Sequence, residues 1–185
     1  MNIFYLSNDP VEAAQAHLDK HVVKMILEYA QLLSTAHRLL DGTPHLTKSK
    51  TGRNVVRYIL PESRENTLYS ATHINHPSAI WARKSVSNYK YLYSLFICLC
   101  KEYEYRYGKT HLCYTKLAKQ LSVPPHNIPE GEFTEPTPAM PDDVKVAGNS
   151  VESYRNYYIN NKQHLATWNG KLNSRPIPEW FHANV

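Results

Sequence analysis

The chain has 185 residues, of which 42% are hydrophobic and 20% are charged. This length fits one domain with one substantial core, and the composition is not that of a disordered protein. The formal net charge is +5, but residues 130–143 carry five acidic side chains and no Lys or Arg, so the remainder carries +10. Such a basic body permits a phosphate-rich partner, DNA or a nucleotide, although many basic proteins bind neither.

Several function classes have no support in the sequence. No apolar segment approaches the roughly 20 residues needed to span a membrane, and the longest lies around Leu92–Leu99. Cys98, Cys100 and Cys113 lack CxxC spacing, so we expect buried free thiols rather than a disulfide scaffold. No signal peptide is apparent, which favours the cytoplasm, of the host cell if the protein is phage-encoded. Phosphate-loop, Rossmann and serine-hydrolase motifs are absent, and no cofactor is expected.

The first half of the chain predicts one long helix. An extended apolar piece, Asn2–Leu6, precedes Asp9, which is a typical N-cap before a proline at the first helical position, with Glu12 completing a capping box. The helix is expected to run to about Leu40, where Asp41-Gly42 stops it. The following residues, 43–72, suggest a basic loop that leads into a short element. Its cations are Lys48, Lys50, Arg53 and Arg57.

The second half predicts two more long helices and one short one. A second long helix is expected from His76-Pro77-Ser78 to Gly108, a short one over 114–121, and a last one from Asn149 to about Trp168. Residues 121–148 form a proline-rich acidic strap, and the tail 171–185 is expected to dock through two aromatic rings. The sequence therefore predicts a mainly α protein, with one helical domain over 1–185, three or four main helices and long irregular connections.

The first long helix carries a narrow polar stripe between two apolar faces. Such a helix is typical of a bundle centre, and its stripe opens either to water or into a cleft. A solvated face supported by pairs such as Lys24–Glu28 is one interpretation. The other is a functional cleft, which the mixture of histidines, cations and one carboxylate favours. The stripe consists of His17, Lys20, His21, Lys24, Glu28, Gln31, Thr35 and Arg38.

Two further readings concern ions. His17 and His21 are four residues apart and could share a metal, but the glutamate of HExxH is missing and neighbouring lysines repel cations, so we expect no metal site. The loop before the second long helix suits an anion such as phosphate, or else His76 simply caps that helix. Its candidate residues are His73, Asn75, His76, Trp81 and Arg83.

Several segments resemble a family of small phage-encoded proteins along nearly the whole chain. They are Asn2-Ile3-Phe4, residues 19–28 and 31–33, the Asn75-His76-Pro77 turn, residues 105–109 and residues 154–158. The order of parts is more weakly similar to the small helical pyrimidine-dimer DNA glycosylases. Those enzymes share a short N-terminal segment, a long helix with His, basic residues and a catalytic Glu, and an aromatic C-terminus.

The glycosylase resemblance implies catalysis by the chain's own α-amine with help from a helix glutamate. An α-amine ordinarily has a pKa near 7.7–8.0, so part of it is unprotonated and nucleophilic at neutral pH. Glu28 would take the glutamate's role, with Met1 as amine and His21 as a further catalytic residue. His17, Lys20, Lys24 and Arg38 would hold phosphates. The chain departs from that family because Asn2 makes removal of Met1 less expected.

The sequence thus predicts a DNA glycosylase with abasic-site lyase activity. A non-catalytic binder of nucleic acid or nucleotides, and an enzyme acting on free or modified nucleotides, remain alternatives. All three depend on whether the polar stripe lies in a shared concavity, and above all on whether Met1, Glu28 and His76 converge.

Overall fold

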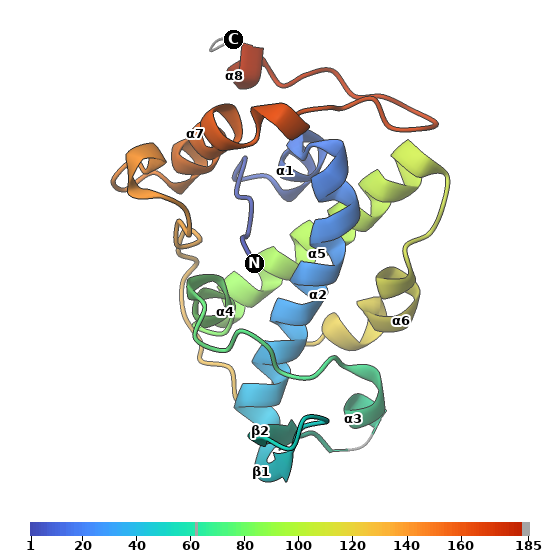
Figure 1. Cartoon of the computed structure of the whole chain (residues 1–185), viewed down its shortest axis with the longest axis vertical. Helices are drawn as coiled ribbons and strands as arrows, with labels where there is room; N and C mark the ends of the chain where they lie inside the picture. The colour runs from blue at the N-terminus through green and yellow to red at the C-terminus, as the bar shows by residue number, and fades with distance from the viewer. Residues whose placement is uncertain (62, 183–185) are drawn as a thin grey trace.

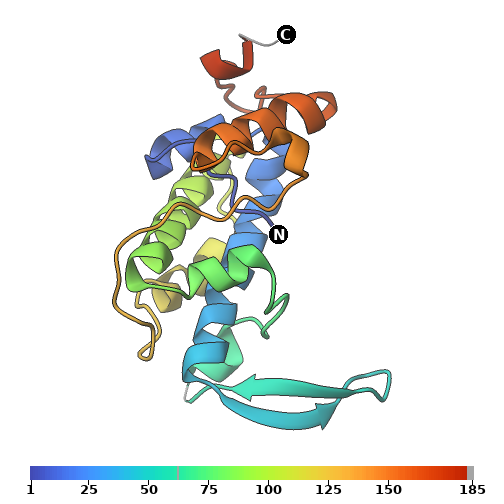
Figure 2. The same cartoon turned by 90° about the vertical axis from the view of Figure 1, so that its left-hand side faces the viewer.

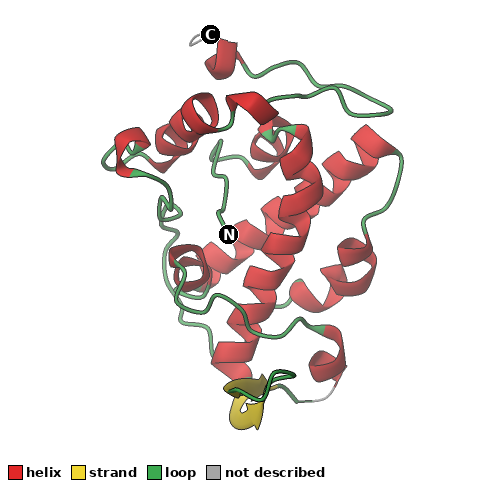
Figure 3. Ribbon diagram, viewed as in Figure 1, coloured by secondary structure: helices red, strands yellow, loops and turns green. Residues whose placement is uncertain are grey.

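The computed structural model describes residues 1–61 and 63–182, and helices dominate them, as predicted (Figures 1 and 3). A small two-stranded sheet is the other regular element. No helix among the described residues is long and apolar enough to cross a membrane. In chain order the elements are α1 (Pro10–Ala16), α2 (Asp19–Asp41), β1 (Thr43–Lys48), β2 (Asn54–Ile59), α3 (Ser63–Thr67), α4 (Pro77–Ala82), α5 (Val86–Tyr107), α6 (Leu112–Leu121), the 3-10 turn Asp142–Val144, α7 (Ser150–Asn161), the 3-10 turn Gln163–Leu165 and α8 (Glu179–His182).

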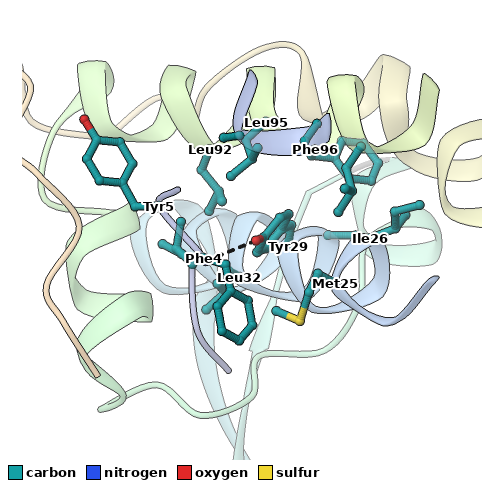
Figure 4. Close-up of a cluster of buried hydrophobic side chains, with 14 of the residues drawn as sticks. Phe4, Tyr5, Met25, Ile26, Tyr29, Leu32, Leu92, Leu95 and Phe96 are labelled. Carbon is teal, nitrogen blue, oxygen red and sulfur yellow. Dashed lines mark hydrogen bonds between the residues drawn. The ribbon is translucent and has the colours of Figure 1, made fainter. Parts of the chain in front are cut away.

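The core lies mainly between α2 and α5, which cross near the middle of the molecule (Figure 1). The N-terminal segment is threaded into this core, and Ile3 and Leu6 have no exposed surface. Figure 4 shows Phe4 and Tyr5 packed beside side chains of both long helices. The expectation that the N-terminal piece packs against the body is therefore confirmed.

The single helix expected from Asp9 to Leu40 is wrong, because it is broken at His17 and Leu18. Asp9 does cap α1 by accepting from the amides of Val11 and Glu12. The backbone then turns extended at His17, with ψ of 132°. No proline or glycine causes this break, so local sequence did not reveal it.

Long-range contacts satisfy the backbone groups that the break leaves free. The Arg106 guanidinium donates to the Gln15 carbonyl at 2.9 Å, and the Trp168 indole donates to the Ala16 carbonyl at 3.0 Å. Asp19, at the start of α2, accepts from Arg106 at 2.8 Å. Arg106 is fully buried and also pairs with Glu102 at 2.7 Å. Helix α5 thus fixes the angle between α1 and α2.

The second long helix is interrupted as well. It consists of α4 and α5, and Ser85 caps α5 by accepting from the amide of Asn88 at 3.2 Å. Gly108 ends α5 in the left-handed conformation, with φ of 64°, as its position in the sequence predicted. The last long helix begins at its expected cap, Asn149, but ends at Asn161, well before Trp168.

The strap and the tail both contact the body. Trp81 donates to the carbonyl of Thr134 at 2.8 Å, which holds the strap against α4. Phe181 in the tail is buried, and its ring lies 5.1 Å from that of Trp168. Residues 183–185 of the predicted tail lie outside the described residues.

The basic loop expected over 43–72 is wrong in part, because it contains the antiparallel hairpin β1–β2. The hairpin projects from the body beyond the end of α2 (Figure 2). None of its strand residues is buried. With both faces exposed, it lacks the alternation of apolar and polar residues by which a half-buried strand is recognised.

Arg106 provides a test of the helix junction. We expect Arg106→Leu to lower the free energy of unfolding by about 3–5 kcal/mol, since it leaves buried Glu102 with one cation fewer. Denaturant unfolding measures this loss. Lys101→Leu on the exposed face of the same helix is the matched control and should change stability by about 0.5 kcal/mol or less. Equal stability of the two variants would contradict the role given to Arg106.

Candidate functional site

The start of the chain is held in place by hydrogen bonds from three other elements. Ser78 donates to the Met1 carbonyl at 3.1 Å, and the Tyr29 hydroxyl accepts from the Phe4 amide at 3.2 Å (Figure 4). Arg155 donates to the Leu6 carbonyl at 3.0 Å. These contacts fix the position of the Met1 amine relative to α2.

That amine lies beside the carboxylate of α2. The Met1 nitrogen is 3.8 Å from Glu28 Oε2, and Lys24 Nζ is 3.3 Å from Glu28 Oε1. The Glu28 side chain is 15% exposed, whereas that of Lys24 is 70% exposed. The carboxylate therefore joins two amines at the border between the core and the solvent.

The loop before α4 brings two histidines to the same region. The Thr35 hydroxyl accepts from the Thr72 amide at 3.2 Å and donates to its carbonyl at 3.3 Å, which ties this loop to α2. His73 follows with a left-handed φ of 49°. Desolvation lowers the pKa of His76, and the Met1 amine and His73 lower it further while Glu28 opposes them. Met1, Glu28 and His76 thus occupy one electrostatic neighbourhood.

His76 itself follows the simpler of its two predicted roles. Its Nδ1 accepts from the Ser78 amide at 3.2 Å and caps α4. Helix α4 has only six residues. The anion site expected at the start of a long helix is therefore wrong, because the helix there is short and its first free amide is already bound. His73 and Asn75 are exposed beside it.

The two histidines of the stripe are structural. His17 has no exposed surface, and its Nδ1 lies 2.6 Å from the Ala13 carbonyl while its Nε2 lies 2.9 Å from the Tyr29 hydroxyl. Because a carbonyl only accepts, Nδ1 carries the proton and Nε2 accepts from Tyr29. The expected contact of His17 with phosphate is wrong, since both ring nitrogens are bound inside the core.

His21 connects α2 to α7. Its Nδ1 is 2.7 Å from the Tyr158 hydroxyl, and its ring stacks on Phe4 with centroids 4.2 Å apart. Burial, with smaller effects from His17, Lys162 and Lys24, lowers the pKa of His21 to about 3. A ring that stays neutral at physiological pH is a poor general acid, so the catalytic role predicted for His21 has no support in this geometry.

Two other predicted phosphate ligands are also committed to the fold. Arg38 is 4% exposed, pairs with Glu65 and donates to four backbone carbonyls. These belong to Tyr58, Glu65, Leu68 and Tyr69. Trp81 is 3% exposed and bound to the strap. Phosphate contacts by Arg38 and Trp81 are therefore wrong, because both side chains are nearly fully buried and their donors are bound within the fold.

The remaining candidates are cations with different surroundings. Lys20 and Lys24 are exposed on α2. Arg83 is half-buried in the bend between α4 and α5, where its Nη1 has no hydrogen-bond partner among the described residues. Of the stripe, Lys20 and Lys24 are thus the side chains exposed at the surface, and Lys24 is also paired with Glu28.

Two of the cavities lie away from this cluster. One of about 540 Å³ lies between the hairpin and the residues after α3, and Arg38, Val55 and Tyr58 line it. One of about 350 Å³ is lined by Leu6, Arg155, Trp180 and their neighbours. Neither includes Met1, Glu28 or His76. Among the described residues, no group of three or more His, Cys, Asp or Glu side chains is placed to hold a metal.

Sequence reasoning missed the residues that position this cluster. Ser78 holds the Met1 carbonyl, and Thr35 holds the loop of His73 and His76. Thr35 was part of the stripe, so its polar character at a helix position facing the core was the available signal. For Ser78, no local pattern pointed to the N-terminus, 77 residues away.

Buried histidines make the fold sensitive to acid. Desolvation is the largest cause that lowers the pKa of His17 to about 4, of His21 to about 3 and of His37 to about 4. The unfolded chain binds these protons near pH 6.5, so the stability that the neutral histidines contribute is fully present above that pH and is lost as the pH falls below it. Each histidine contributes a slope of at most about 1.4 kcal/mol per pH unit.

Denaturant unfolding at successive pH values tests this. We expect the free energy of unfolding to drop between pH 6.5 and about 5, a window above the titration of ordinary carboxylates. His21→Asn should be less stable at neutral pH but show a shallower drop. A wild-type profile that is flat down to pH 5 would contradict the buried neutral histidines.

Comparison of the chain with family models, curated proteins and solved structures gives no match. The two resemblances noted in the sequence therefore remain predictions. What the cluster can do chemically has to follow from Met1, Lys24 and Glu28 themselves.

Proposed function

We propose that this protein is a DNA glycosylase and abasic-site lyase that uses an amine beside Glu28 as its nucleophile. The observation that supports this most strongly is the distance of 3.8 Å between the Met1 nitrogen and Glu28 Oε2. Met1 and Glu28 are 27 residues apart in the sequence. Three hydrogen bonds to distant residues hold the N-terminal segment in place. An α-amine is the nucleophile of choice because it is far less basic than a lysine amine.

The reaction starts at the sugar of the target nucleotide. The lone pair of the amine forms a bond to C1′ as the bond from C1′ to the base breaks, and the base leaves with that electron pair and takes up a proton from water. The attacking nitrogen then loses a proton to Glu28. The carboxylate also stabilises the positive charge that develops on the sugar.

Ring opening then gives the imine on which a lyase depends. The electrons of nitrogen form the C=N bond as the bond from C1′ to O4′ breaks, and Glu28 returns its proton to O4′. The protonated imine acidifies C2′, so water takes up a C2′ proton and the electrons of that C–H bond form a C2′=C3′ double bond. The 3′ phosphate leaves with the electron pair of its bond to C3′, which cleaves the strand. Water finally releases the amine.

The surface around Glu28 fits a DNA strand. Exposed residues of α2 combine two cations, Lys20 and Lys24, with two apolar side chains, Val23 and Leu27, which are 44% and 41% exposed. Lysines bind the backbone phosphates, and apolar side chains pack on bases that have left the stack. The position of Glu28 outside the two cavities described above favours a polymer over a small enclosed nucleotide.

Reductive trapping tests this proposal. With duplex DNA that contains an abasic site, borohydride adds hydride to the imine carbon and leaves a stable secondary amine between protein and DNA. We expect the wild type to form this adduct, and Glu28→Gln to form it at least about 100-fold more slowly. Peptide mapping of the adduct identifies the nitrogen, which we expect at Met1 rather than at Lys24.

Glu104→Gln is the matched control, because it neutralises an exposed carboxylate on α5. It should trap as fast as the wild type. Two residues added ahead of Met1 should abolish the adduct while leaving the fold intact. Absence of any trapped species with abasic, dimer-containing or alkylated duplexes would overturn the proposal, and salt-sensitive binding without an adduct would favour a non-catalytic DNA-binding protein.

A further inference from the structure

The β1–β2 hairpin is an arm that is tied to the core near its base, where buried Arg38 donates to the Tyr58 carbonyl at 2.9 Å. Its strands pair in a regular register from Thr43↔Ile59 to Lys48↔Asn54, yet none of their residues is buried. Leu46 is 67% exposed and its partner across the sheet, Val56, is 52% exposed. A two-stranded hairpin gains little stability by itself in water, so an exposed one of this kind is typical of a binding element.

The charge of this arm has a single sign. It carries Lys48, Lys50, Arg53 and Arg57, and no acidic residue occurs between positions 42 and 61. Within residues 1–61 and 63–182, none of these four cations makes an ion pair with a carboxylate. Proline and lysine protect an edge strand from pairing with another chain, which accounts for Pro44 and Lys48 but not for Lys50 and Arg53, which lie in the turn outside both strands.

The tip of the arm has a defined shape. Ser49 accepts from the Gly52 amide at 2.9 Å and donates its own amide to the Arg53 carbonyl at 2.8 Å. Gly52 has a φ of 80°, which glycine adopts without strain. The tip therefore presents Lys50 and Arg53 on an ordered turn.

The arm projects from the side of the body on which the N-terminus lies (Figure 2). Helix α2 connects the arm to the region of the N-terminus. Glu28 lies in the middle of this helix and Asp41 at its end. Thirteen residues of helix span about 20 Å, the length of about six base pairs of duplex. A duplex with its reactive nucleotide at Glu28 therefore reaches the arm between half a helical turn and one full turn away from that nucleotide.

We infer that the β1–β2 hairpin binds duplex DNA by entering the major groove next to the nucleotide on which Glu28 acts. The major groove of B-form DNA is about 12 Å wide and admits a two-stranded β-ribbon. The deep, narrow major groove of duplex RNA does not admit side chains. This inference rests on the proposed function, because it assigns the surface that holds the DNA.

Charge neutralisation tests the arm without deleting it. The arm variant is Lys48→Gln, Lys50→Gln, Arg53→Gln and Arg57→Gln combined, and its binding to an undamaged duplex is measured at several salt concentrations. We expect about tenfold weaker binding or more at low salt, and a log–log salt slope that is smaller by about 3 to 4. The arm variant should keep the melting temperature of the wild type, since all four side chains are exposed.

The matched control removes four exposed lysines elsewhere, at Lys84, Lys90, Lys101 and Lys109, and so has the same net charge. It should keep most of the affinity and of the salt slope. The wild type should also prefer duplex DNA to duplex RNA of the same sequence, and the arm variant should lose this preference. Equal losses in the arm and control variants, or no preference for DNA, would overturn the inference.

The result is separable from that for the proposed function. Trapping by the wild type together with unchanged binding by the arm variant would reject the arm alone. Loss of affinity in the arm variant without any trapped adduct in the wild type would reject the chemistry and keep the arm.

Discussion

One chain of hydrogen bonds at the break between α1 and α2 organises the molecule. The Phe4 amide donates to the Tyr29 hydroxyl, Tyr29 donates to His17 Nε2, and His17 Nδ1 donates to the Ala13 carbonyl. All of these groups are buried, so loss of any member leaves a polar atom without a partner at a cost of about 1–3 kcal/mol. This series of hydrogen bonds requires a neutral His17, and burial keeps the ring neutral by lowering its pKa to about 4. It links the N-terminal segment to α2, and so sets where the Met1 amine lies.

The polar stripe of α2 consequently divides into parts with different tasks. His21, Thr35 and Arg38 turn inward and bind α7, the loop before α4 and the residues after β2. Lys20 and Lys24 face water. Glu28 lies at the boundary, where it is 15% exposed and within reach of two amines. A carboxylate at such a border has surroundings of low dielectric on one side, which strengthens its interaction with a nearby positive charge.

Charge and shape together suggest how a duplex would lie on this protein. The exposed cations Lys20 and Lys24 lie on α2, and the basic hairpin follows the C-terminal end of that helix and projects from the body there (Figure 2). Electrostatic attraction to phosphates acts at long range and is independent of sequence, whereas the amine reacts only within bonding distance. Under the two proposals, the hairpin and the lysines position the DNA, and the N-terminal segment performs the chemistry.

Local sequence was sufficient for those features that depend on neighbouring residues alone. The caps at Asp9, His76 and Asn149 and the stop at Gly108 were predictable, because a cap is formed within one turn of its own helix. The mainly helical fold followed from the same signals.

Tertiary contacts decided the rest. The break at His17 depends on Arg106 and Trp168, and the burial of His21 depends on Tyr158, which lies 137 residues further along the chain. The hairpin escaped prediction because neither face is buried, so no period-two pattern exists to be read. Whether a polar residue on a helix meets water or another element is determined by what packs against it, and residues so distant leave no trace in the local pattern.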